Sequence, residues 1–172
     1  MRNAVIIATN RKRAREVLLS ENMPLEEKIK TAEKLKRSYD NTGQKPRGID
    51  ASILKQYNDF IKQQNGGIML KGKNYSEEYK TKLIETYNYF KEHGYNFREH
   101  ALNRVLGRIG QGKILSKEDV LDVLNNGKKY QEPDGTIVRF KNNISVHIAK
   151  DNGDIKTVIA RKKPKPDWRE IE

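Results

Sequence analysis

Residues 100–108 read HALNRVLGR, a stretch in which a histidine and two arginines recur at every fourth position. Because each residue of an α-helix advances by about 100°, His100, Arg104 and Arg108 would form one polar stripe along its side. Like charges at this spacing repel one another, and a bound phosphodiester would relieve that repulsion. The stripe therefore indicates either a phosphate contact or a solvated basic edge, and the pattern alone does not separate the two.

A second polar group is expected on one face of a β-sheet. Alternation along 136–141, 143–150 and 155–162 predicts core-facing side chains at Val138, Phe140, Ile144, Val146, Ile148, Val158 and Ala160. The opposite face would then carry Arg139, His147, Thr157 and Arg161, together with Ser145 and Ile159. Lys162 follows as a further candidate phosphate contact.

If the helix edge and this sheet face meet, their side chains could cleave RNA without a metal. A histidine with a pKa of about 6.5 can take the proton of a 2′-hydroxyl or give one to the leaving 5′-oxygen. Arginines can hold the phosphate oxygens, and a threonine hydroxyl can add a hydrogen bond. The product would be a 2′,3′-cyclic phosphate, and DNA would survive because it lacks the 2′-hydroxyl.

Metal and nucleotide chemistry are not expected, and the site residues suggest no cofactor. The chain has no cysteine and three histidines, and its acidic residues sit in helix-cap and turn contexts instead of clustering as metal ligands. Gly107, Gly112 and Lys113 have the spacing of a phosphate-binding loop, but Ile114 stands where a Ser or Thr would bind magnesium. Residues 110–113, GQGK, are instead expected to end the helix, with Gly110 and Gly112 in turn conformations.

The charge balance favours a polyanionic partner. Lys and Arg number 35 against 23 Asp and Glu, a net charge of +12, and this excess raises affinity for phosphate backbones. The apolar run over 4–8 is too short for a signal peptide or a membrane span, so we expect no membrane association and folding in an aqueous compartment.

Helical periodicity dominates the first two thirds of the chain. Helices are expected over 4–21, 24–40, 51–64, 76–94, 97–110 and 116–127, with Asp50, Ser76 and Ser116 as N-caps. Strands are expected over 128–133, 136–141, 143–150 and 155–162, separated by turn residues. The order predicts an α+β fold: a helical accessory segment, 1–66, and a domain over 67–172 in which a small antiparallel meander packs on helices.

The segment from Phe97 to Arg161 resembles the bacterial toxin nucleases of the barnase–EndoU–colicin–RelE superfamily. The similarity rests on three motifs in order: a helix of the form H-x3-R-x3-R (HALNRVLGR), a short helix beginning S-x-E-D-V and followed by Gly (SKEDVLDVLNNG), and a last strand g-x-I-x-T-V-I (GDIKTVIAR). It covers about the last 75 residues, including the Pro-containing tail KKPKPDW.

The resemblance implies a barnase/RelE-like fold and metal-independent cleavage of RNA, often transfer RNA, in competition between bacteria. It implies action in the bacterial cytoplasm, in some cases after delivery from another cell within a larger toxin, and a cognate immunity protein as partner. By motif position the family's helical His maps to His100, its helical Arg to Arg104 and its last-strand hydroxyl to Thr157. Two alternatives stay open: a non-catalytic nucleic-acid-binding protein, and a phage-associated or structural protein that binds a partner.

Overall fold

The computed structural model describes residues 2–72 and 74–172, with side chains described from residue 10 onward. It divides into two compact units, Met1–Met69 and Leu70–Glu172. The boundary lies three residues from the one expected at 66/67. Each unit has its own buried residues and is described separately.

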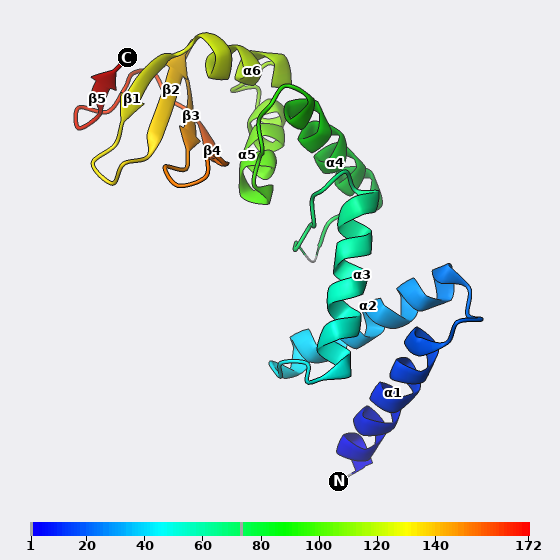
Figure 1. The fold of residues 1–172 in the computed structure, drawn as a ribbon. Helices are drawn as coiled ribbons and strands as arrows, with labels where there is room; N and C mark the ends of the chain where they lie inside the picture. The colour runs from blue at the N-terminus through cyan, green and yellow to red at the C-terminus, as the bar shows by residue number, and fades with distance from the viewer. Residues whose placement is uncertain (1, 73) are drawn as a thin grey trace. The chain divides into compact units, whose positions relative to one another are not determined.

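The first unit is built from α1 (Arg2–Leu19), α2 (Leu25–Thr42) and α3 (Ile49–Gln64) (Figure 1). Leu35, Tyr39 and Leu54 form its core cluster, with Ala14 and Leu18 packed against them. The helix α2 begins after Pro24, as the sequence predicts, and ends at Gly43, whose φ of 64° is readily adopted by glycine.

The expectation that Asp50 caps α3 is wrong. The helix begins at Ile49 and its N-cap is Gly48, so Asp50 lies in the first turn. Its side chain is turned into the unit, where it is 4% exposed and contacts Arg15 and Tyr39. The carboxylate of Asp50 therefore pairs with the distant Arg15 instead of capping the helix locally.

The second unit combines helices with an antiparallel sheet, which confirms the α+β class. Its helices are α4 (Glu77–Glu92), α5 (Glu99–Gly110) and α6 (Lys117–Asn126). The side chain of Ser76 accepts from the backbone of Tyr79, and Ser116 forms a capping box with Asp119, so both expected N-caps are confirmed. Gly112, with φ of 68°, follows the end of α5 as predicted.

The described strands are β1 (Lys128–Gln131), β2 (Ile137–Lys141), β3 (Ile144–Ile148), β4 (Ile155–Ala160) and β5 (Arg169–Ile171), in the spatial order β4-β3-β2-β1-β5 (Figure 1). The first four form the expected meander. Asn142 and Asn143 both have positive φ in the tight β2–β3 turn. The strand β5 was not expected, and it pairs with the outer edge of β1.

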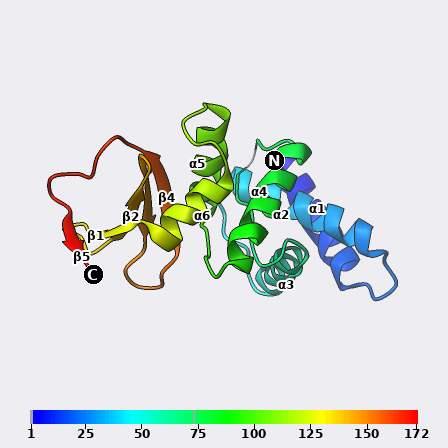
Figure 2. The same cartoon turned by 90° about the horizontal axis from the view of Figure 1, so that it is seen from above.

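The helices of this unit place one face of the sheet in the core. The helix α6 contacts β2 and β3, and α5 contacts β4 (Figure 2). Fully buried side chains on this side include Val146, Val158 and Ile155, with Leu102 and Val105 of α5 and Val120 of α6 among the buried helical residues. No helix in the described part of the chain is long and apolar enough to cross a membrane.

Candidate functional site

The helix α5 presents His100 and Arg104 to solvent. Its apolar side is formed by Ala101, Leu102 and Val105, each 0% exposed, and this burial orients the opposite edge outward. Nε of Arg104 lies 3.4 Å from Nε2 of His100 and donates toward it, as the four-residue spacing predicts. An imidazole nitrogen that accepts this hydrogen bond must be unprotonated.

Arg108 continues the stripe at the C-terminal end of α5. Its Nη1 donates to Oε1 of Gln111 at 3.0 Å, while its Nε is shielded from solvent and has no partner among the described residues. The cation also lies where the helix macrodipole favours positive charge. Arg108 is thus partly committed to ending the helix, and less of its guanidinium is free for a ligand.

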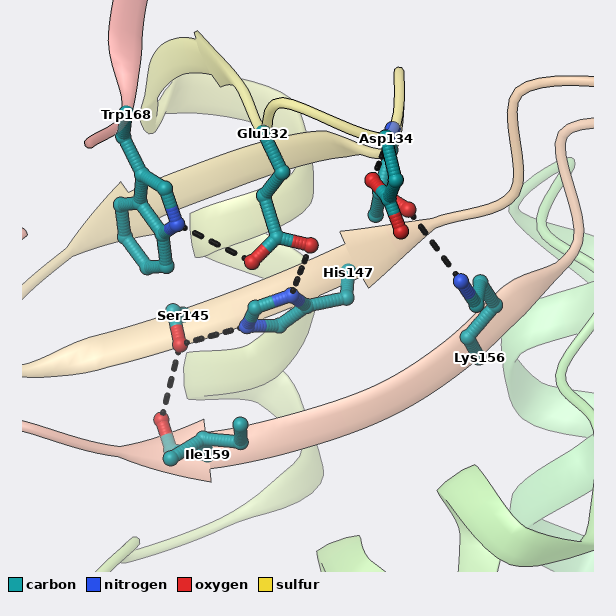
Figure 3. Close-up of polar contacts among 8 residues, drawn as sticks. Glu132, Asp134, Ser145, His147, Lys156, Ile159 and Trp168 are labelled. Atoms are coloured by element: carbon teal, nitrogen blue, oxygen red, sulfur yellow. Dashed lines mark hydrogen bonds and ion pairs between the residues drawn. The ribbon is translucent and has the colours of Figure 1, made fainter. Parts of the chain in front are cut away.

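The sheet face that α5 and α6 do not cover, which we call the open face, carries His147. Its Nε2 lies 3.1 Å from Oγ of Ser145, and its Nδ1 lies 3.5 Å from Oε2 of Glu132 (Figure 3). Thr157 is the direct cross-strand partner of His147, so their side chains share this face. His147 and Thr157 are therefore brought together as the alternation predicted.

Trp168 from the C-terminal segment packs over this group. Its Nε1 donates to Oε1 of Glu132 at 3.0 Å, and its ring meets that of His147 edge-on with centroids 5.6 Å apart (Figure 3). The guanidinium of Arg161 lies over the ring of Trp168, 4.8 Å from the ring centroid. His147 is consequently only 5% exposed.

The surroundings of His147 favour the neutral imidazole. Burial lowers the pKa of His147 below its usual range, and the cations Arg161 and Lys165 lower it further, while Glu132 acts in the opposite direction. A carboxylate beside Nδ1 favours the tautomer with its proton on Nδ1, which leaves Nε2 to accept from the hydroxyl of Ser145. His147 is therefore an oriented base covered by aromatic packing.

The face assigned to Arg139 is wrong. Arg139 pairs directly with Val146, so it points to the helix-covered side, where its Nη1 donates to the carbonyl of Gly127 at 3.0 Å. Val138 pairs with His147, and Phe140 with Ser145, so both lie on the open face instead of the expected core side. Alternation fixes the two faces of a strand only relative to each other, and the cross-strand register decides which one meets the helices.

The sequence-predicted residues form two groups on neighbouring elements. The helix α5 begins beside the edge strand β4, where the backbone N–H of Arg98 donates to the carbonyl of Ile155 at 3.0 Å. Among the described residues, no hydrogen bond or ion pair joins His100, Arg104 or Arg108 to the His147 group. Arg161 belongs to the open-face group through Trp168, and Lys162 is exposed at the end of β4.

Three further residues, Ser145, Glu132 and Trp168, contact His147 on the open face and are not among the site residues expected from the sequence. Ser145 was detectable, because it lies two positions before His147 on one strand and shares its face. Glu132 and Trp168 were not, since they lie 15 and 21 positions from His147 and only folding brings them to it. Within the described ranges, no three His, Asp or Glu side chains gather as a metal-binding cluster.

Comparison with protein-family models, with curated proteins and with solved structures gave no match for this chain. The resemblance to the toxin nuclease superfamily therefore continues to rest on the three motifs quoted above.

Proposed function

We propose that Leu70–Glu172 is a metal-independent ribonuclease. The observation that carries the proposal is the exposed contact between His100 and Arg104, a base and a cation accessible to a strand of RNA on a rigid helix. The net charge of +12 supplies long-range attraction for the substrate.

In the proposed reaction, Arg104 turns from Nε2 of His100 to the phosphate, and the freed Nε2 takes the proton of a 2′-hydroxyl while the 2′-oxygen attacks phosphorus. A bond forms between phosphorus and the 2′-oxygen, the bond to the 5′-oxygen breaks, and solvent protonates the leaving oxygen. Arg104 holds the phosphate and stabilises its developing charge, with Arg108 as a further contact. Thr157 lies with His147 on the sheet face that α5 does not cover, so its hydroxyl takes no part in this step. The buried His147 is a positioning residue: its contacts with Ser145 and Glu132 hold the side chains of the open face in place.

The biological part of the proposal follows from the family resemblance. The substrate is RNA, with transfer RNA as the first to test, and the protein acts as a toxin in the bacterial cytoplasm. Delivery from another cell within a larger toxin and neutralisation by a cognate immunity protein belong to the same proposal.

Incubation of the purified chain with total RNA in EDTA tests this function. We expect fragments with 2′,3′-cyclic phosphate ends, and a loss of about 100-fold or more in rate for His100→Ala. The matched control is His93→Ala, which removes an exposed histidine at the end of α4 and should leave the rate unchanged. Intact RNA at high protein concentration overturns the proposal, and cleavage that His100→Ala does not alter moves the site elsewhere.

A second candidate function is RNA binding without cleavage, favoured by aromatic side chains on the open face. Phe140 and Tyr130 lie on this face with Trp168, whose ring is 6.0 Å from that of Tyr130. Aromatic rings beside cations form stacking surfaces for unpaired bases. Retention of RNA without any cleavage, weakened by Tyr130→Ala, would favour this function over catalysis.

A further inference from the structure

The first unit contains an open pocket lined mostly by cationic side chains. Its volume is about 770 Å³, and its wall includes five cations against a single carboxylate, that of Asp50. The cations come from two separated segments: Arg11, Lys12 and Arg15 from α1, and Lys45 and Arg47 from the loop before α3. Cations gathered around one space repel each other unless an anion enters it.

The carboxylate of Asp50 in this wall is already neutralised. Oδ1 and Oδ2 of Asp50 accept from Nε and Nη2 of Arg15 at 2.8 and 3.2 Å, and Oδ2 also accepts from the hydroxyl of Tyr39 at 2.7 Å. The hydrogen bond from Arg15 holds the pKa of Asp50 below its usual range despite burial. Asp50 therefore positions Arg15 and Tyr39 and leaves the charge of the other cations uncompensated.

Arg11 is held in place with two donors to spare. Its guanidinium stacks 4.4 Å from the centroid of Tyr39, and its Nη1 donates to Oε1 of Gln44 at 3.1 Å. Its Nε and Nη2 are shielded from solvent and have no acceptor among the described residues. These two atoms form the edge with which Arg15 grips Asp50, and in Arg11, which also lines the pocket, this edge has no carboxylate partner among the described residues.

We propose that this pocket binds a phosphate group of a nucleic-acid strand. A turn of the Arg11 side chain brings its donor edge to two oxygens of one phosphate in the pocket, and such donors are costly to leave unpaired. Lys45 and Arg47 are exposed at the rim and can contact the neighbouring phosphates of the strand. The inference concerns the first unit, and it holds whether or not the second unit cleaves RNA.

The test measures binding of the full chain to a short fluorescent RNA strand with 2′-O-methyl riboses, which attack by the 2′-oxygen cannot cleave. We expect Arg11→Lys, which keeps the charge and loses the two-pronged donor, to weaken binding about tenfold. Arg47→Ala should lower the salt dependence of binding by about one phosphate contact, and its exposed position leaves the fold intact.

The matched control is Arg37→Ala, which removes an exposed positive charge from α2 outside the pocket. It should change affinity by less than about twofold, because exposed charges are screened by salt. Equal losses in Arg37→Ala and Arg47→Ala would reduce the effect to overall charge, and unchanged binding in Arg11→Lys would show that the two-pronged donor is not used; either result overturns the proposal.

Two competitors identify the ligand. Inorganic pyrophosphate should displace the strand from the wild type and bind Arg11→Lys more weakly, which assigns the pocket to phosphate itself. The contrary result is that pyrophosphate displaces the RNA strand from neither the wild type nor the pocket variants, while an oligoglutamate peptide displaces it in a way that depends on Arg11. The pocket is then a site for acidic proteins, and the proposal fails. Far-UV circular dichroism of each variant verifies that the helices are retained.

Discussion

The carboxylate of Glu132, directly after β1, lies 3.5 Å from Nδ1 of His147 on β3, although β2 separates β1 from β3. Its other oxygen accepts from Trp168, so a single acidic side chain orients both rings of the open face. Burial of His147 follows from this arrangement.

The stability of the second unit should depend on pH through His147. Its folded pKa lies below the unfolded value of about 6.5, so between these two values the unfolded chain binds more protons. The free energy of unfolding should therefore rise with pH across that interval and be lower near about pH 5.5 than near about pH 7.5. Urea unfolding followed by the fluorescence of Trp168 measures it, and His147→Gln should reduce the difference. An unchanged difference in the variant would assign the effect to another group.

Removal of the Trp168 ring should raise the pKa of His147. Burial is the largest cause of its lowered pKa, and Trp168→Ala opens His147 to water. Histidine NMR titration measures the shift, with His147→Gln identifying the resonance. The matched variant Trp168→Phe keeps an aromatic ring over His147 and should leave its pKa low; a rise of the same size there would point to the lost hydrogen bond to Glu132.

Two glycine substitutions in the second unit should have opposite effects. A Cβ at Gly127 would lie 2.5 Å from the carbonyl oxygen of Val123, which is backbone and cannot move aside, so Gly127→Ala should destabilise by about 2 kcal/mol. A Cβ at Gly107, inside α5, meets nothing within 4 Å, so Gly107→Ala should stabilise by about 0.5–1 kcal/mol. Urea unfolding compares the two, and a stabilising Gly127→Ala would contradict the packing at the α6–β1 junction.

Asp50→Asn should destabilise the first unit by about 2 kcal/mol, because it weakens the hydrogen bonds to Arg15 and Tyr39 at a buried position. Asp59→Asn is the control, since the ion pair of Asp59 with Lys55 is exposed and should contribute less than about 0.5 kcal/mol. Trp168 is the only tryptophan, so helix loss by circular dichroism that precedes the fluorescence change reports on the first unit. Equal losses in both variants would show that Asp50 has no special role.

Local sequence was sufficient to predict the six described helices and the strands β1 to β4, but not β5. Ser116 and Asp119 are three residues apart and Asn142 and Asn143 are adjacent, so the capping box and the tight turn depend on the chain nearby. The apolar spacing within 97–110 likewise predicted which side of α5 is buried and which side carries His100 and Arg104.

Only the tertiary structure decided which residues surround His147 and Arg11. The register between β2 and β3 turned Arg139 toward the helices, and Trp168, which directly precedes β5, packed against His147 on the open face. The carboxylate of Asp50 binds Arg15, 35 positions away, instead of capping α3, and this contact helps to form the basic pocket. Helical and strand periodicity act over a few residues, whereas sheet register and ion pairs between distant segments are settled by which packing buries the most apolar surface and pairs the most polar groups.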